Sequence, residues 1–597
     1  MSGPRPDVAR AVGEALVRLG AGTVFGVVGS GNFHVTNALV AGGARFVAAR
    51  HEGGAATMAD AYARVSGGLG VLSVHQGPGL TDALTGITEA AKSRTPLLVV
   101  TGEVAAGAVR SSVRIDQAAL AAAVGAVPER VHSPRTALAD VARACRTAVA
   151  ERRTVVLGLP LDVQAAEYTG EEALTRPVPR PAVRPAPGAG AGAAVSSGAG
   201  AGTPPRSPFA RPASVPPLPV PPPAAVARLA DLLAAARRPV FVAGRGARLS
   251  GAREPLRALA DRCGALLATS AVARGLFRGD PYDLDVSGGF ATPAAAELIA
   301  GADLLVGWGA SLNEWTLHKD TPNSGTLRRG ARVVQIDVDP RALGAHRNVD
   351  LSLVGDAAET ARAAEAELAA RGHSSPGYRS DALRERLARE RRWRDHPYRD
   401  ASDGSRIDPR TLSIALDDLL PAERTVAVDS GNFMGYPAMF LDVPDADGLV
   451  FTQAFQSVGL GLATAIGAAV ARPDRLTVAA LGDGGALKSI AELETAVRLG
   501  LGLLVVVYDD EAHGAEVHRF GPAGHPLDTV TFPPADLAAI GQGFGCHAVT
   551  VRKREDLGAV ADWLAGPRDR PMLVDAKVTV DTPAWWLDEA FRGDHGD

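Results

Sequence analysis

The chain alternates short, strongly apolar runs with longer amphipathic segments over most of its length. The runs are rich in β-branched residues and lead into Gly-rich turns, which is typical of buried strands, and the amphipathic segments have the length of helices. Strands that are apolar on both faces predict parallel sheets covered by helices on both sides. We therefore expect an α/β fold built from doubly wound parallel sheets.

The strand candidates fall into three blocks. They are TVFGVVG, RFVAAR, GLGVLSVHQ, TPLLVVTG and RTVVLGLP in the first block, RPVFVAG, ADLLVGWG and ARVVQIDVD in the second, and RTVAVDSG, RLTVAALGDG, GLLVVVYDD and RPMLVDAKV in the third. In such sheets, ligands bind at the carboxyl ends of the strands.

Two segments interrupt this alternation. Residues 176–222 are mainly Pro, Ala, Gly, Ser and Arg, so they cannot bury enough apolar surface to offset their ordering entropy and are expected to form a flexible linker. Residues 372–405 are highly charged and mark a softer boundary. We therefore expect domains at 1–175, 223–372 and 405–580, followed by a C-terminal tail at 581–597.

Composition and charge narrow the function classes. Hydrophobic residues make up 46% and charged residues 21%, an ordinary globular balance, and the formal net charge is −4. This charge predicts neither a nucleic-acid partner nor a membrane surface. No apolar run is long enough to span a bilayer, and the N-terminus lacks the apolar core of a signal peptide. The three cysteines match no metal-ligand spacing. A reducing, cytoplasmic location fits best.

Two carboxylates follow neighbouring strand candidates of the third block. Asp483 follows residues 476–481 in a Gly-Asp-Gly-Gly turn before a helix expected around SIAELETAVRLG, and Asp510 follows residues 503–508. A βαβ unit would bring both to one sheet edge. The glycines and the helix N-terminus favour an anion such as a diphosphate, and carboxylates facing it need a hard cation such as Mg²⁺. From the residues alone, ordinary turn and cap roles remain an alternative.

Several stretches resemble one enzyme family. The Gly-Asp-Gly turn with paired acids downstream resembles the cofactor motif of thiamine-diphosphate-dependent enzymes. In chain order, FGVVGSGN, RHEGGAATMADAYARVSG, GPGLTDALTGITEAAKSRTPLLVVTGE and QSVGLGLATAIGAAVARPDR are similar to the acetolactate synthase and benzoylformate decarboxylase group. The resemblance spans nearly all of the chain outside the linker. It implies a pyrimidine-binding domain, a central Rossmann-like domain and a diphosphate-binding domain.

The resemblance also implies how the cofactor is held. Asp483, Asp510 and the main-chain carbonyl of Ala512 would bind the metal ion. The residues expected against thiamine diphosphate in this part of the chain are Gly431, Asn432, Val458, Gly459, Gly482, Gly484 and Gly485, with Val458 under the bend of the cofactor. One departure is that the family has Asn-Asn where this chain has Asp509-Asp510. A second acid suits Mg²⁺ but adds negative charge beside the diphosphate, which puts the cofactor affinity in doubt.

Three residues of the first block are implied in catalysis. Glu52 matches the glutamate that hydrogen-bonds the aminopyrimidine and activates the cofactor, although its position alone also fits a first-turn helix carboxylate. Ser30 and His75 match a serine and a histidine in the active site of benzoylformate decarboxylase. A histidine is a suitable proton shuttle. The alternatives are a turn hydroxyl for Ser30 and a hydrogen-bonded strand-end residue for His75, while His318 and His518 are expected at the surface.

The implied reaction is decarboxylation of a 2-oxo acid followed by carboligation to a second carbonyl, as in acetolactate synthases. A simple decarboxylase and a cofactor-binding homologue without turnover remain alternatives. The middle domain has Gly-rich turns but lacks the family's Arg-Phe-Asp-Asp run, so FAD is not expected. The resemblance implies a homodimer or homotetramer with sites at the subunit interface. The tail, with Trp585 and Trp586, could cover the site or dock elsewhere.

Overall fold

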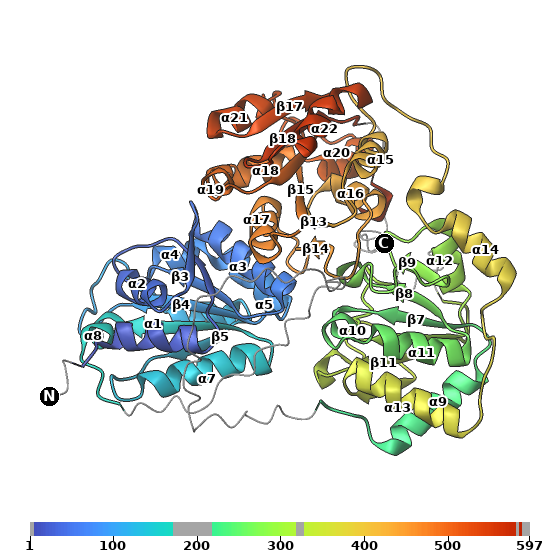
Figure 1. Cartoon of the computed structure of the whole chain (residues 1–597), viewed down its shortest axis with the longest axis horizontal. Coiled ribbons are helices and arrows are strands. Elements are labelled where there is room, and N and C mark those ends of the chain that lie inside the picture. The colour runs from blue at the N-terminus through green and yellow to red at the C-terminus, as the bar shows by residue number, and fades with distance from the viewer. Residues whose placement is uncertain (1–4, 171–217, 318–326, 581–583, 588–597) are drawn as a thin grey trace, which may run out of the picture. The chain divides into compact units, whose positions relative to one another are not determined.

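The computed structural model describes residues 5–170, 218–317, 327–580 and 584–587, so most of the predicted linker lies outside the described residues. The chain divides into two compact units, Met1–Pro216 and Pro217–Asp597. One six-stranded sheet lies in the first unit and two lie in the second (Figure 1). The strands of each sheet pair in parallel, which confirms the expected α/β fold of doubly wound parallel sheets.

The sheet of the first unit has helices on both faces. Its strand order is β2 (Arg45–Ala48), β1 (Thr23–Gly26), β3 (Gly70–Val74), β4 (Leu97–Glu103), β6 (Thr154–Pro160) and β5 (Val127–Arg130). The helices are α1 (Val8–Arg18), α2 (Phe33–Ala41), α3 (Glu52–Ser66), α4 (Pro78–Asp82), α5 (Leu84–Lys92), α6 (Gln117–Ala123), α7 (Ala137–Ala150) and α8 (Leu161–Ala165).

Successive residues of strand β1 show why this sheet is apolar on both sides. Val24 belongs to the core cluster formed with helices α1 and α7. Phe25, the next residue, packs its ring against Tyr62 of helix α3, with the ring centroids 5.6 Å apart. Because side chains alternate along a strand, the two residues face opposite layers.

The first sheet of the second unit forms the middle region of the chain. Its order is β12 (Leu351–Val354), β11 (Arg332–Asp337), β10 (Leu304–Trp308), β7 (Pro239–Ala243), β8 (Leu266–Thr269) and β9 (Asp283–Val286). Its helices are α9 (Pro223–Ala235), α10 (Arg245–Leu249), α11 (Arg253–Cys263), α12 (Pro293–Ala300) and α13 (Ala357–Ala370), and α14 (Asp381–Glu390) lies within the charged segment that follows.

The second sheet of this unit contains the paired acids. Its order is β14 (Leu449–Phe451), β13 (Arg424–Val428), β15 (Leu476–Gly482), β16 (Leu503–Asp509), β18 (Met572–Lys577) and β17 (His547–Val551). Its helices are α15 (Pro409–Leu419), α16 (Gly435–Phe440), α17 (Gly461–Ala471), α18 (Asp483–Ser489), α19 (Glu492–Arg498), α20 (Gly514–Phe520), α21 (Leu537–Phe544) and α22 (Gly558–Ala565).

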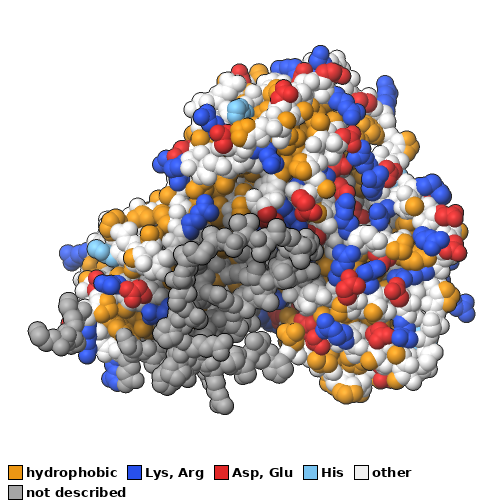
Figure 2. All heavy atoms as spheres, viewed as in Figure 1, with side chains coloured by type: hydrophobic (Ala, Val, Ile, Leu, Met, Phe, Trp, Pro, Cys, Tyr) orange, Lys and Arg blue, Asp and Glu red, His pale blue; other side chains and the backbone are white. Residues whose placement is uncertain are grey.

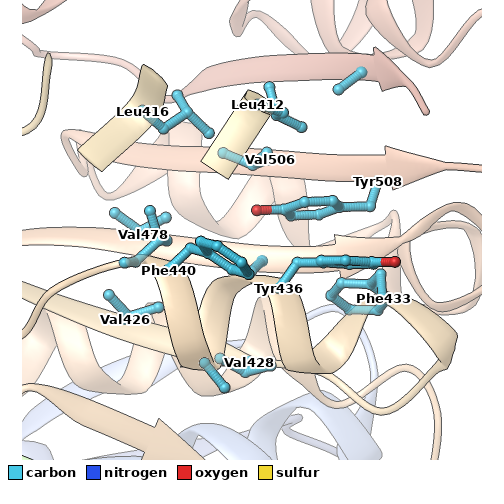
Figure 3. Packing of buried hydrophobic residues seen from close by; sticks show 14 of the residues in the cluster. Leu412, Leu416, Val426, Val428, Phe433, Tyr436, Phe440, Val478, Val506 and Tyr508 are labelled. Atoms are coloured by element: carbon cyan, nitrogen blue, oxygen red, sulfur yellow. The ribbon is translucent and has the colours of Figure 1, made fainter. Parts of the chain in front are cut away.

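Helices α15 and α16 pack on one face of this sheet. Figure 3 shows their apolar side chains against those of the central strands, and the residues of this cluster are buried. Phe433 stacks on Tyr508 with a centroid distance of 5.3 Å, and the Tyr508 hydroxyl contacts the Ser413 hydroxyl at 2.8 Å. This packing fixes the chain just before α16, where the predicted turn Gly431-Asn432 lies.

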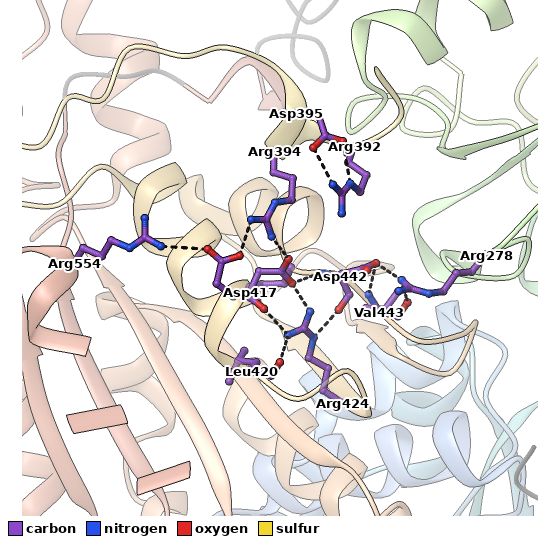
Figure 4. Close-up of polar contacts among 12 residues, drawn as sticks. Arg278, Arg392, Arg394, Asp395, Asp417, Leu420, Arg424, Asp442, Val443 and Arg554 are labelled. Carbon is purple, nitrogen blue, oxygen red and sulfur yellow. Dashed lines mark hydrogen bonds and ion pairs between the residues drawn. The ribbon is translucent and has the colours of Figure 1, made fainter. Parts of the chain in front are cut away.

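An ion-pair network holds the other end of helix α16 (Figure 4). Asp417 pairs with Arg424 and with Arg394, the latter at 2.7 Å, and accepts the backbone N–H of Asp442 at 2.8 Å. Arg278, from the middle region, pairs with Asp442 and donates to the carbonyl of Val443 at 2.7 Å. The network therefore connects the two sheets within the second unit.

On the face drawn in Figure 2, acidic and basic side chains are interspersed. None of the described helices combines the length and the apolar composition needed to cross a membrane.

Candidate functional site

Glu52 lies where strand β2 leads into helix α3, of which it is the first residue. The side chain of His51 caps this helix by accepting the Gly53 N–H at 3.0 Å. Glu52 is therefore not needed as the cap. Its side chain is half-buried, and no hydrogen bond or ion pair of its carboxylate is found within the described part of the chain.

Ser30 and His75 are in contact. Ser30 follows strand β1 and His75 follows strand β3, and these strands are neighbours in the sheet. The Ser30 Oγ lies 3.3 Å from the His75 Nε2, while the His75 Nδ1 lies 2.6 Å from the carbonyl oxygen of Gln76. Because a carbonyl can only accept, Nδ1 must carry a proton, which leaves Nε2 of the neutral ring able to accept from Ser30.

Glycines bring these three predicted residues close together. A Cβ placed on Gly79 would lie 3.1 Å from the His75 Cβ and 3.5 Å from the Glu52 Oε1. A Cβ on Gly29 would lie 2.6 Å from the His75 Cδ2. Gly79 and Gly29 were not singled out from the sequence, although the Gly-Pro-Gly run after His75 is a signal for a tight turn. The structure therefore groups Glu52, His75 and Ser30 at one sheet edge.

The two predicted metal-binding carboxylates also meet. Strands β15 and β16 pair in parallel with Gly482 opposite Tyr508, so Asp483 and Asp510 follow neighbouring strand ends. Burial raises the pKa of both carboxyl groups, and the charge of Asp509 raises both further. The charge of Asp483 also raises the pKa of Asp510, whereas the hydrogen bond with the Asp510 side chain lowers the pKa of Asp483. The helix begins at Asp483 itself, earlier than the SIAELETAVRLG segment, which is broken between α18 and α19. Asp483 thus lies in the first turn of a helix.

The loop after Asp510 has a tight bend. Glu511 has a φ of 58°, in the left-handed region that non-glycine residues rarely adopt. Asp510 accepts the backbone N–H of Ala512, and Ala512 forms an isolated bridge with Thr531. The bend thus places Asp510 and the main chain of Ala512 in the same short loop.

The predicted glycines form a surface that side chains would fill. A Cβ on Gly431 or Gly482 would lie within 3.2 Å of the Phe433 ring, and one on Gly484 would lie 3.1 Å from the His513 ring. A Cβ on Gly485 would lie 2.4 Å from the Asp429 Oδ2. Because glycine has no side chain, the backbone at these positions can approach a ligand closely.

Asn432 joins this group from the turn before α16. A Cβ on Gly514 would lie 2.3 Å from the Asp510 Oδ2 and 3.1 Å from the Asn432 Nδ2, so the two side chains border the same glycine. The Asn432 Oδ1 is buried and has no hydrogen-bond partner in the described structure. A buried acceptor without a protein partner can accept a hydrogen bond from a bound ligand or water.

Asp429 is a site residue that the sequence reasoning missed. Its buried carboxylate accepts the backbone N–H groups of Ser430, Gly459 and Leu460 at 2.8–3.1 Å. Burial raises its pKa to about 6, against the opposing effect of these hydrogen bonds. Asp429 thereby fixes the turn that contains the predicted residues Val458 and Gly459. The only signal in the sequence was its place at the end of a strand candidate.

Asp509, the first acid of the pair, is turned away into the protein. It is 1% exposed, and its carboxylate lies 2.5 Å from the Nζ of Lys577. Lys577 also lies 3.2 Å from Asp575. Burial alone would lower the pKa of Lys577, but the hydrogen bond with Asp509 and the charges of both acids raise it.

These residues fit a divalent metal and a diphosphate. Two carboxylates and a main-chain carbonyl are the hard oxygen donors that Mg²⁺ prefers, and Mg²⁺ commonly completes its shell with phosphate oxygens and water. No cluster of three or more His, Cys, Asp or Glu side chains suited to a metal ion occurs among the described residues. The predicted site therefore needs the carbonyl of Ala512 and oxygens of the ligand.

The other residues noted in the sequence are two histidines, the Gly-rich turns of the middle region and the tail. His318 is outside the described residues, and His518 lies on α20. In the middle region, a Cβ on Gly244 would lie 2.3 Å from the Gly309 carbonyl oxygen, so these Gly-rich turns pack on each other. That contact accounts for the glycines without a nucleotide, and the expectation against FAD stays a prediction. Of the tail, Trp586 is fully buried in the core beside α16.

Most of the chain matches models of a known protein family. Three models of the thiamine pyrophosphate enzyme family match the chain. The model of the N-terminal thiamine pyrophosphate-binding domain matches residues 6–122, that of the central domain matches residues 226–364, and that of the C-terminal thiamine pyrophosphate-binding domain matches residues 429–576.

Curated relatives match over nearly the whole length. A probable 2-ketoarginine decarboxylase of Pseudomonas aeruginosa is 30% identical over 93% of this chain and 91% of the relative. An acetolactate synthase large subunit of Parasynechococcus marenigrum is 28% identical over 96% and 87%, and a sulfoacetaldehyde acetyltransferase of Castellaniella defragrans is 27% identical over 91% and 88%. With three family models matching in order and a relative of this identity, the chain belongs to the thiamine pyrophosphate enzymes.

Proposed function

We propose that this enzyme decarboxylates a 2-oxo acid with thiamine diphosphate and a divalent metal ion, and releases the product by protonation as an aldehyde. The observation behind this proposal is the contact between Ser30 and His75 beside Glu52. When bound, thiamine diphosphate supplies the nucleophilic carbon and the electron sink for decarboxylation. The residues of the chain bind the cofactor, orient the substrate and move protons.

Glu52 is proposed to hydrogen-bond the aminopyrimidine ring of the cofactor. Its carboxylate is half-buried at a helix start whose cap is already provided by His51. A carboxylate without an internal partner in the described structure is available to hold a proton at the ring nitrogen. This role accords with its place in the N-terminal cofactor-binding domain of the family.

His75 and Ser30 are proposed to handle the substrate. With Nδ1–H donated to the Gln76 carbonyl, the neutral ring presents Nε2 toward Ser30. A protonated ring can donate from Nε2 to a substrate carboxylate or deliver that proton to the product carbon. Ser30 would orient the ring and contact the same substrate group.

Asp483, Asp510 and the Ala512 carbonyl are proposed as the metal ligands. Gly431, Asn432, Gly482, Gly484 and Gly485 are proposed to contact the diphosphate, with Val458 and Gly459 beside the cofactor. The helix that begins at Asp483 adds its N-terminal N–H groups, which favour an anion.

We also propose that two copies of the chain build each site, as the family resemblance implies. The Glu52 group and the Asp483 group belong to different units of the chain. A homodimer or homotetramer is the expected assembly. Sedimentation velocity would test this, and a monomer with full activity would contradict it.

A second candidate is carboligation, in which the product carbon attacks a second carbonyl. Relatives named acetolactate synthase and sulfoacetaldehyde acetyltransferase favour it, since each aligns with more than 90% of this chain. The Ser30–His75 pair favours protonation instead, because it provides a proton donor beside Glu52.

The test is CO₂ release from pyruvate, benzoylformate and 2-ketoarginine, with and without thiamine diphosphate and Mg²⁺, followed by product analysis. Glu52→Gln should lower cofactor-dependent release at least about a hundredfold, which is about 2.7 kcal/mol in barrier. An aldehyde supports the simple decarboxylase, and a ketol supports carboligation. Tight cofactor binding without release from any substrate would favour a homologue without turnover.

A further inference from the structure

Three acids stand in a row where the metal site is proposed: Asp509, Asp510 and Glu511. These three carboxylates lie close together in the chain, and Asp483 lies opposite them. Their combined negative charge exceeds what one divalent cation can offset beside a diphosphate. The structure contains a cation for each of the two flanking acids.

Lys577 is paired with Asp509. Asp509 ends strand β16 and lies directly opposite Lys577 in the parallel ladder with β18. The Nζ lies 2.5 Å from the Asp509 carboxylate and 3.0 Å from the carbonyl oxygen of Ala535. Lys577 is only 5% exposed. Such a buried pair holds both side chains firmly, since separating them would leave a charge without a partner.

Arg406 is paired with Glu511. The guanidinium donates to the Glu511 carboxylate at 2.6 Å and to the carbonyl oxygen of Val578 at 3.0 Å. Both side chains are about one quarter exposed. Glu511 has the left-handed φ of 58°, so this ion pair stabilises the bend between Asp510 and Ala512. Val578 follows Lys577, so both cations are anchored at the same end of strand β18.

We propose that Lys577 and Arg406 are positioning residues of the metal site: each turns one flanking acid away and compensates its charge, so that Asp510 alone of the three acids binds the metal ion. This inference rests on the proposed metal site at Asp483 and Asp510. It accounts for the acid at 509 in place of asparagine, because Asp509 is paired with a lysine.

The arrangement of the acids explains why the lysine matters. Asp509 is close enough to Asp483 and to Asp510 for its charge to act on both. Without Lys577, a buried carboxylate would lack its closest cation. It would repel the diphosphate or rotate toward the metal ion, and either change disturbs the loop that holds Asp510 and Ala512.

The test measures the affinity for thiamine diphosphate at saturating Mg²⁺ by titration calorimetry on the full chain. Lys577→Met should weaken binding at least about tenfold, equivalent to about 1.4 kcal/mol. The double variant Asp509→Asn with Lys577→Met removes the acid at 509 together with its cation and should return to within about threefold of wild type. Asp575, the other acid beside Lys577, then loses its cation too, but burial favours its protonated, neutral form. Asp509→Asn alone should also stay within about threefold, since Lys577 keeps Asp575 as a partner.

Three results would overturn the proposal. If Lys577→Met binds thiamine diphosphate as tightly as wild type, the pairing with Asp509 is not needed. If the double variant Asp509→Asn with Lys577→Met binds as weakly as Lys577→Met, Lys577 does not act through Asp509. A tenfold loss in Asp509→Asn would make Asp509 a ligand. If Lys577→Met does not fold, Arg406→Met decides, compared with the double variant Arg406→Met and Glu511→Gln. The proposal is supported if Arg406→Met weakens cofactor binding and the added Glu511→Gln restores it. It is contradicted if Arg406→Met does not weaken binding or if Glu511→Gln does not restore it.

Asp510→Ala separates this inference from the proposed function. It should abolish measurable metal-dependent binding. If it leaves binding unchanged, the proposed metal site is wrong. If it abolishes binding while Lys577→Met and Arg406→Met do not weaken it, only the role of the two cations is wrong.

Discussion

The Asp429 carboxylate accepts the backbone N–H of Gly459, with both oxygens 3.0 Å from the nitrogen. Gly459 has a φ of 98°, a conformation that favours glycine. The contact joins the end of strand β13 to the turn before helix α17, far apart in sequence. Burial raises the pKa of the Asp429 carboxyl to about 6.

Asp429→Asn should change how stability depends on pH. Because the folded state holds the Asp429 proton more tightly than the unfolded state, this group lowers the free energy of unfolding as pH rises from about 4 to about 6. Wild type regains this stability on acidification, and the asparagine variant cannot. The Tm of metal-free Asp429→Asn should therefore fall more than that of wild type between pH 7 and pH 4.5. The opposite order would contradict the raised pKa.

Gly485→Ala should disturb the cofactor site. The new Cβ would lie 2.4 Å from the Asp429 Oδ2, which accepts the backbone N–H of Gly459. We expect a loss of about 1–3 kcal/mol in stability, typical of overpacking, together with weaker cofactor binding. Gly558→Ala is the matched control, because its Cβ would meet no atom within 4 Å. Thermal unfolding and calorimetric titration measure both effects, and equal behaviour of the two variants would refute the clash.

Trp586→Ala should destabilise the second unit. The Trp586 ring is fully buried and packs edge-on against Tyr436 at 4.9 Å. A Cβ on Gly435 would lie 2.4 Å from the ring, so the fit is tight. Removing the ring should cost about 3–5 kcal/mol. Leu587→Ala, at a partly buried neighbour, should cost less. Thermal unfolding tests the difference, and a Tm equal to wild type would mean that this segment does not dock in solution.

The Ser30 and His75 variants should be coupled in catalysis. We expect kcat/KM to fall about a hundredfold in His75→Ala and about tenfold in Ser30→Ala, within the range for proton-transfer groups. Ser30 is expected to act through the 3.3 Å contact with His75, so the double variant should be no worse than His75→Ala. Multiplied effects would indicate independent roles.

The strands that sequence analysis missed lie mainly at sheet edges. Twelve strand candidates correspond to the central strands of the sheets, together with β2 at one edge. The missed strands are β5, β8, β9, β12, β14 and β17, of which all but β8 are edge strands. Strand β12 alternates buried and exposed residues, and β5 alternates partly buried and exposed ones, so one face of each of these two strands is exposed. An apolar run therefore identifies a strand covered on both faces, and misses strands such as β5 and β12 that expose one face.

The sequence by itself determined the α/β class, the presence of three sheets and the family, because these depend on local apolar patterning and on short motifs. It also placed Glu52, Asp483 and Asp510 at the starts of helices or the ends of strands. Which side chains meet was decided only by the tertiary structure. Ser30 contacts His75, and Asp509 contacts Lys577, because strand order and register bring distant residues together. No local pattern encodes that register, since it results from packing of the whole sheet.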